Sequence, residues 1–272
     1  MAKTPQDEMS FLDHLEDLRW HLIRATLSIV VVATLAYVFS RQIFDHIIFA
    51  PKSMDFFTYK YLCKSANFIG VETTFCAEEL PLIIQNRTMG GQFSADIWTS
   101  IYAGFIIAFP YVIYQFWSFI SPGLHPSERR YSRGFILVTS LLFFLGVTFG
   151  YYIVTPLSIN FLANYRVSDI VDNQIDISSW ISLVRSSAIA SGLIFELPII
   201  IYFFTKIGLV TPEILKKYRK FALVIVLILS AIITPPDIAS QVIVAIPILI
   251  LYQISIFISK MVIRNQKKKR TA

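Results

Sequence analysis

Carboxylates at three places in this sequence stand where they could bind a cationic or polar group. The first, Glu196, lies inside an apolar run that begins near Arg185 and stays apolar to Phe204. A charge in the middle of a membrane-spanning helix costs at least about 2.5–3.5 kcal/mol, so such a group usually faces a cavity or a partner. Either Glu196 is protonated and inert, or the protein needs a polar group inside the membrane; the second interpretation is favoured.

The second group of carboxylates lies close to the N-terminus. Ser10 begins a capping-box pattern, which predicts that a helix starts at this residue. Three acidic residues and a tryptophan follow at spacings i, i+3, i+4 and i+7 and therefore share one helix face: Asp13, Glu16, Asp17 and Trp20. This acidic face immediately precedes the first apolar span.

The third carboxylate, Glu128, lies beside two arginines in the connection Ser121–Arg130. Two interpretations of the acidic residues remain open. They are solvated surface with local ion pairs to neighbouring arginines (Arg19, Arg129 and Arg130), or they form a docking site for a cationic peptide, because a carboxylate accepts both arms of a guanidinium group. His14 and His21 share a helix face, but without a third ligand no metal site is predicted.

The composition indicates the class of protein. Hydrophobic residues make up 55% of the 272 residues, charged residues make up 15%, and the mean hydropathy is +0.62. Soluble domains average about 45–50% apolar and about 25% charged residues, so an all-α polytopic membrane protein is predicted. Motifs typical of nucleotide-binding loops, zinc hydrolases and dinucleotide folds do not occur in the sequence. Neither an enzyme nor a cofactor is therefore predicted.

Six spans are predicted within a single membrane domain that covers residues 1–272. Their approximate bounds are 21–39, 97–120, 134–157, 186–204, 221–233 and 238–259, with long external connections at 41–94 and 158–185. Pro110 predicts a kink in the second span. The fifth span has only 13 residues, about 20 Å of helix, and Pro247 interrupts the sixth. Such short spans predict a thinned bilayer, since the hydrocarbon core is about 30 Å thick.

Basic residues predict the orientation of the chain. The N-terminus, the connections 121–133 and 205–220 and the tail from Lys260 hold 16 lysines and arginines, against 7 on the opposite side. By the positive-inside tendency, both termini are cytoplasmic. Cys63 and Cys76 are then external, where either a disulfide or two unpaired thiols remain open. A short basic helix is predicted to start at Thr211-Pro212-Glu213.

Glutamines inside the apolar spans (Gln115, Gln241 and Gln253) are expected to form hydrogen bonds between helices. A different class of protein is also considered: a secondary transporter or proton channel in which Glu196 titrates. That class predicts a path of facing polar residues and often an internal repeat, and neither stands out in the sequence. A membrane enzyme would need a nucleophile–base or metal-ligand arrangement, which the sequence does not suggest.

Four motifs in one order carry a resemblance to a known family. They are HLEDLRWHL at His14–Leu22, FISPGLHPSERR at Phe119–Arg130, FELP at Phe195–Pro198 and TPPDIASQ at Thr234–Gln241. Together, from about Ser10 to Lys260, they resemble TatC, the multispanning receptor of the twin-arginine protein translocase. The resemblance implies six helices in a cupped arrangement in the bacterial cytoplasmic (inner) membrane.

The resemblance also implies a function and partners. A protein of this family binds the twin-arginine signal peptides of folded precursor proteins and assembles with TatA- and TatB-like single-span proteins, and self-association in the translocase is expected. Export is driven by the proton-motive force. No nucleic acid is involved.

Site residues carry over from the resemblance by position. Glu128 corresponds to the signal-binding glutamate of the first cytoplasmic loop. Asp17, followed by Arg19, stands where the family usually has a glutamate, so either Asp17 or the adjacent Glu16 makes the second contact. The remaining matches are Phe119 and Pro122 near the hinge, Pro51 after the first span, the intramembrane Glu196 associated with partner helices, and the polar pair Asp237 and Gln241. The long connection 41–94 is larger than the family pattern.

Overall fold

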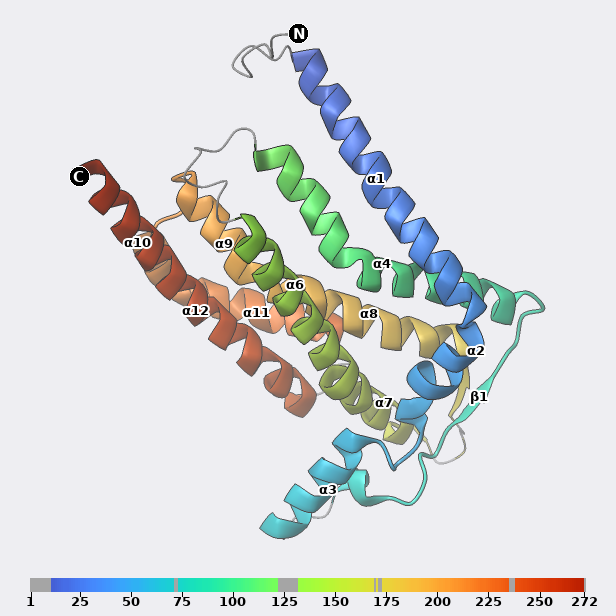
Figure 1. Ribbon diagram of the computed structural model, residues 1–272. Helices are drawn as coiled ribbons and strands as arrows, with labels where there is room; N and C mark the ends of the chain where they lie inside the picture. Colours follow the sequence, from blue (N-terminus) through green and yellow to red (C-terminus); the bar gives the residue numbers. More distant parts are fainter. Residues whose placement is uncertain are drawn as a thin grey trace. The chain divides into compact units, whose positions relative to one another are not determined.

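The computed structural model describes residues 11–70, 73–121, 132–168, 170, 173–234 and 238–271, most of them helical (Figure 1). Among these residues, five helical segments are long and apolar enough to cross a membrane: His14–Val38, Gly91–Ile120, Gly134–Asn164, Ile177–Lys206 and Ser240–Gln266. The chain is therefore an all-α polytopic membrane protein, as its composition predicts. It divides into two compact units, one of Met1–Ile43 with Phe93–Leu141 and the other of Phe44–Gln92 with Leu142–Ala272.

The first unit contains helix α1 (Phe11–Val38), the short α2 (Ser40–Ile43) and nearly all of α4 (Gly91–Ile120). A Cβ atom on Gly104 would lie 2.8 Å from the backbone nitrogen of Ala33, so the glycine lets α1 and α4 approach closely. Pro110 lies inside α4 and cannot donate the backbone hydrogen bond of a regular helix. The ribbon of α4 changes direction along its length, in agreement with the predicted kink (Figure 1).

The second unit begins its membrane segments with the end of α6 (Ser132–Phe149), the π-helical turn Gly150–Val154 and α7 (Thr155–Asn164). These pack against α8 (Ile177–Phe195) through small residues. A Cβ atom on Gly150 would lie 2.3 Å from the carbonyl oxygen of Ser187, and one on Gly146 would lie 2.6 Å from that of Ser191. Glycines four residues apart thus let two helix backbones meet, as small residues do in membranes.

The external connection predicted at 158–185 is shorter in the structure than the sequence suggested. Helix α7 continues to Asn164, and α8 begins at Ile177 rather than near Ser186. The reason is local capping: the carboxylate of Asp176 accepts a hydrogen bond from the backbone N–H of Ser178 at 2.9 Å and starts the helix. Arg185 therefore lies inside α8. The apolar pattern alone places the start of this helix too late in the sequence.

The long connection predicted at 41–94 contains more secondary structure than its polar sequence suggests. After a π-helical turn (Phe44–Ile48) and a 3-10 turn (Ala50–Lys52) come helix α3 (Phe57–Ile69), a 3-10 turn (Thr74–Cys76) and strand β1 (Ile83–Gln85). Strand β1 pairs in parallel with β2 (Gln174–Asp176), with Ile84 opposite Ile175. Two connections that are distant in the sequence are thereby joined.

The fifth and sixth predicted spans correspond to α11 (Arg219–Ile233) and α12 (Ile238–Thr271). With 15 residues, α11 is about 22 Å long and thus short, as predicted. The expectation of a short sixth span is wrong, because α12 has 34 residues and continues through Pro247. An interior proline removes one helical hydrogen bond and crowds the preceding turn, but packing of α12 against α11 and α9 (Leu197–Lys206) supports the helix.

Polar side chains connect these last helices. Gln241 Nε2 donates to the carbonyl oxygen of Leu227 at 2.9 Å, and the guanidinium of Arg219 donates to Gln253. The prediction of helix–helix hydrogen bonds by these glutamines is confirmed. The predicted helix start at Thr211 is confirmed too, since its hydroxyl accepts from the backbone N–H of Ile214 at the start of α10 (Pro212–Lys217).

Candidate functional site

The first turns of α1 and the last turn of α4 are joined by two histidines. The ring of His14 stacks on Phe119 with a centroid distance of 4.6 Å, and His21 Nδ1 lies 2.7 Å from Gln115 Oε1. Gln115 is buried, so the hydrogen bond satisfies a polar group that would otherwise be costly. These contacts fix the acidic face of α1 beside the end of α4, and they confirm the expected role of Gln115.

Glu16 and Asp17 are exposed on this face, and so is Arg19. No ion pair between these three residues and other parts of the chain is found among the residues that the structure describes. Beside them lies a small recess lined by side chains of both helices: Leu18, His21, Leu22, Ala25, Gln115, Phe116 and Phe119. Water-exposed carboxylates next to an apolar recess can accept a cationic group whose neighbours are apolar.

Several predicted site residues lie outside the described residues. Helix α4 ends at Ile120 and its last described neighbour is Ser121, whereas Pro122 and Glu128 follow in the segment that is not described. The same holds for Asp237 between α11 and α12, and for the side chain of Asp13. Phe119, by contrast, is placed by its contact with His14.

Glu196 occupies a break in a membrane span rather than the middle of one continuous helix. Helix α8 ends at Phe195, and α9 starts at Leu197 with Pro198 in its first turn. The proline interrupts the helical hydrogen bonds, which explains why the span breaks at this point. The uninterrupted helix expected from the apolar run is therefore corrected to two shorter helices that meet at the carboxylate.

The Glu196 side chain is buried in the second unit, with 8% of the residue exposed. Its Oε1 atom has no hydrogen-bond partner among the residues that the structure describes. Two serine hydroxyls on the preceding turns of α8, those of Ser187 and Ser191, are likewise buried without such a partner. A buried polar atom without a hydrogen-bond partner costs free energy. The end of α8 and Glu196 therefore have hydrogen-bonding groups that the described residues do not satisfy.

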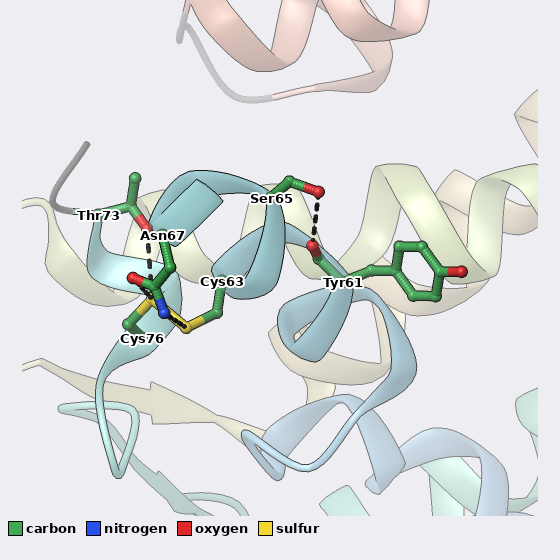
Figure 2. The surroundings of a disulfide bond; sticks show 6 residues. All are labelled: Tyr61, Cys63, Ser65, Asn67, Thr73 and Cys76. Carbon is green, nitrogen blue, oxygen red and sulfur yellow. Dashed lines mark hydrogen bonds between the residues drawn. A yellow bond between two sulfur atoms is a disulfide. The ribbon is translucent and has the colours of Figure 1, made fainter. Parts of the chain in front are cut away.

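The remaining predicted positions are structural in character. Pro51 is buried, and its carbonyl oxygen lies 3.2 Å from the hydroxyl of Tyr59. Burial raises the pKa of the Tyr59 phenol above its ordinary value, so the hydroxyl stays a donor. Cys63 and Cys76 are joined by a disulfide of 2.12 Å, with Asn67 and Thr73 around the sulfur atoms (Figure 2). Of the two alternatives for these cysteines, the structure has the bonded pair.

Both histidines of α1 contact side chains of α4. His21 forms a hydrogen bond with Gln115, and the ring of His14 stacks on Phe119. Within the described ranges, no group of three His, Cys, Asp or Glu side chains is arranged to hold a metal ion.

Sequence reasoning missed the close contact of α6 and α8 at Gly146 and Gly150, although their G-x-x-x-G spacing could have indicated it. It also missed helix α3. There the spacing of Phe57, Tyr61 and Phe68 on one face was a usable signal.

Comparisons with known proteins decide the family. A family model described as Sec-independent protein translocase protein (TatC) matches residues 13–247. The chain belongs to the TatC family. The TatC protein of Blattabacterium sp. subsp. Periplaneta americana (strain BPLAN) is 44% identical over 258 residues, with 94% of this chain and 97% of the relative covered.

Two further comparisons agree. The TatC protein of Aquifex aeolicus (strain VF5) is 34% identical over 265 residues, covering 97% of this chain and 100% of the relative. A crystal structure described as that of the twin arginine translocase receptor TatC has a TM-score of 0.68 at 33% identity, covering 92% of this chain and 99% of the other. This TatC chain is thus a multi-pass membrane component of the Sec-independent, twin-arginine protein translocase.

Proposed function

We propose that this TatC chain is the receptor subunit that binds twin-arginine signal peptides of folded precursor proteins. The arginine pair binds Glu128 together with Asp17 or Glu16. The observation that carries the proposal is the stacking of His14 on Phe119 at 4.6 Å. That contact holds the acidic face of α1 at the end of α4, from which the chain continues into the segment that contains Glu128.

Charge and geometry favour arginine over lysine at such a site. Each charge-assisted hydrogen bond contributes about 1.5–3 kcal/mol. A guanidinium group engages a carboxylate through two parallel bonds, whereas an ammonium group acts as a compact point charge. Exposed Glu16 and Asp17 can be reached from the aqueous side. Leu22 and Phe116, which line the recess between α1 and α4 and are half exposed, offer contacts for apolar residues near the arginine pair.

Glu196 has a separate role in this proposal, as a contact for a TatA- or TatB-like single-span partner. Its Oε1 atom is buried and lacks a partner among the described residues, and its small exposed part is where a polar side chain of another helix gains access. A hydrogen bond from that helix would remove the cost of the unsatisfied carboxyl oxygen. Gln241, which bonds the carbonyl oxygen of Leu227, is a further candidate contact for the partner, and Asp237 is assigned to the same role by its place in the family motif.

Orientation and energy source complete the proposal. Both termini are cytoplasmic in a bacterial inner membrane, because the basic residues concentrate on that side. Helix α11, about 22 Å long, is too short for a hydrocarbon core of about 30 Å, so the bilayer beside it is thinned. Local thinning lowers the barrier to passage of a folded cargo, which the proton-motive force drives.

Peptide binding to the purified protein tests the receptor role. A twin-arginine signal peptide and a twin-lysine peptide are titrated into the parent protein and into Glu128→Ala at two salt concentrations. We expect the parent to prefer arginine and the variant to lose that preference. Glu79→Gln removes a carboxylate from the opposite side and serves as the matched control. Equal binding of the two peptides by a folded parent protein would contradict the receptor role and return attention to a transporter in which Glu196 titrates.

A further inference from the structure

Helix α3 is fixed to the protein by one face. Tyr59 is wholly buried, and its hydroxyl lies 3.2 Å from the carbonyl oxygens of Pro51 and Pro156. The neighbouring Thr58 hydroxyl donates to the carbonyl oxygen of Tyr152. The orientation of the helix about its own axis is therefore set by hydrogen bonds to Pro51 and to the C-terminal half of the span Gly134–Asn164.

The opposite face of α3 is aromatic and exposed. Phe57, Tyr61, Lys64 and Phe68 follow one another at i, i+4, i+7 and i+11, the spacing of a single helix face. The three aromatic residues are 62%, 64% and 93% exposed. Exposure of such an apolar strip to water is unfavourable. The strip therefore indicates a contact with something outside the chain.

The strip is continuous with the outer surface of a membrane span. The ring of Phe57 lies 5.0 Å from that of Tyr61 and 6.4 Å from that of Tyr152, which is half exposed on the span. Phe56 stacks on the same tyrosine at 5.5 Å. Tyrosine is enriched at the boundary between lipid and water, and Tyr152 lies in the C-terminal half of the span Gly134–Asn164. In Figure 1, α3 runs across the direction of α7 rather than extending it.

Charge on α3 suits a lipid headgroup region better than a dry protein interface. Lys64 belongs to the strip, and Lys60 is exposed beside it and pairs with Asp55 at 3.1 Å. Lysine side chains can lay their apolar stems along lipid while the ammonium group binds phosphate. An amphipathic helix with aromatic and basic residues is typical of a segment that lies in the membrane interface.

We propose that α3 is an interfacial helix whose strip, Phe57, Tyr61, Lys64 and Phe68, lies in the headgroup region of the leaflet at this end of the protein. Its contacts with Tyr152 and Pro156 then set the depth of the span Gly134–Asn164, and the disulfide Cys63–Cys76 keeps the second half of α3 in place. The inference does not depend on signal-peptide binding.

Depth-dependent quenching of fluorescence tests the proposal. Phe68→Trp is prepared in the full chain and placed in nanodiscs of phosphatidylcholine and phosphatidylglycerol, with bromine either near the headgroup or near the end of the acyl chains. The emission of the parent, which has 4 tryptophans, is subtracted. We expect the new tryptophan to be quenched, and more strongly by the shallow bromine. No quenching by either lipid would overturn the proposal.

A matched control and a second variant make the test specific. Ile83→Trp places a tryptophan at an exposed position of β1, outside the strip, and should be quenched much less. Equal quenching at the two positions would overturn the assignment to α3. Tyr61→Trp repeats the measurement at a second strip position if Phe68→Trp fails to fold. A blue-shifted emission that brominated lipid does not quench would mean that a protein or a second copy covers the strip, and would also overturn the proposal.

Discussion

His21 and Gln115 are 94 residues apart in the sequence, yet the Nδ1 atom of one lies 2.7 Å from the Oε1 atom of the other. This contact joins α1 to α4 next to the stacked pair of His14 and Phe119. His21 follows His14 on α1, and Gln115 precedes Phe119 on α4. The contact therefore holds the carboxylates of α1 in register with the end of α4. The receptor proposal depends on this register.

A double-mutant cycle measures the coupling of this pair. Gln115→Leu leaves His21 without its partner and is expected to lower the free energy of unfolding by about 1–2 kcal/mol. His21→Leu should cost a similar amount, and the double variant should cost less than the sum. Thermal unfolding in detergent, followed by monomer recovery, gives the values. Strictly additive losses would mean that the two side chains do not stabilise one another.

The close contact of α8 with the π-helical turn that follows α6 predicts a sharp difference in stability between variants of two glycines. Gly150→Ala would place a Cβ atom 2.3 Å from the carbonyl oxygen of Ser187, so the helices must separate, at a cost of about 1–3 kcal/mol. Gly134→Ala, also on this span, meets nothing within 4 Å and should be neutral or slightly stabilising. The two variants are heated in detergent and their folded fractions are compared with that of the parent protein. We expect Gly150→Ala to unfold at a lower temperature than Gly134→Ala. Equal stability of the two variants would contradict the packing described.

Asp176 predicts a dependence of the α8 start on pH. The Ser178 hydroxyl, the backbone N–H of Ser178 and Arg87 hold the pKa of this carboxyl below its ordinary value. Because the pKa is lower in the folded state, the stabilisation is present above the ordinary aspartate pKa of about 3.9 and is lost as pH falls through the folded value. Hydrogen exchange of the first α8 amides should therefore accelerate in acid. Asp176→Asn retains a cap and should abolish the dependence on pH; an unchanged profile in this variant would exclude the carboxyl.

Glu196→Gln separates the two proposed roles. The amide keeps the size of the side chain but changes its donors and acceptors, so co-purification of TatA- and TatB-like partners should weaken while signal-peptide binding remains. Ser191→Ala, another buried polar position without a partner among the described residues, is the matched control and should retain the partners. Loss of peptide binding with partner association intact would argue against this division of roles.

The sequence predicts most of the long apolar helices because the length of an apolar run reports directly on burial in lipid. It fails where a single residue overrides the apolar pattern. Asp176 starts α8 earlier than its apolar run, Pro198 breaks the span at Glu196, and Pro247 does not break α12. Contacts across long separations, such as Ile84 with Ile175, are not visible in one sequence without an alignment of relatives.

The candidate site follows the same division. Gln115 was expected to bond another helix because a lone amide in an apolar helix needs a partner, but the identity of that partner, His21, depended on how α1 and α4 pack. The stacking of His14 on Phe119 was not predicted for the same reason. For Glu128 and Asp17 the residue pattern left a docking site and a solvated surface open, and only the resemblance to TatC favoured the docking site.

The most direct test of the receptor claim is a thermodynamic cycle across the contact itself. A signal peptide in which one arginine of the pair is replaced by citrulline, a neutral analogue of similar shape, is titrated into the parent protein, Glu128→Gln, Asp17→Asn and Glu16→Gln. We predict that citrulline weakens binding to the parent by roughly tenfold or more, as expected for loss of a charge-assisted bond, and has little further effect in the variant that has lost the partner carboxylate. Equal weakening by citrulline in the parent and in all three variants would mean that none of these carboxylates binds the arginine pair.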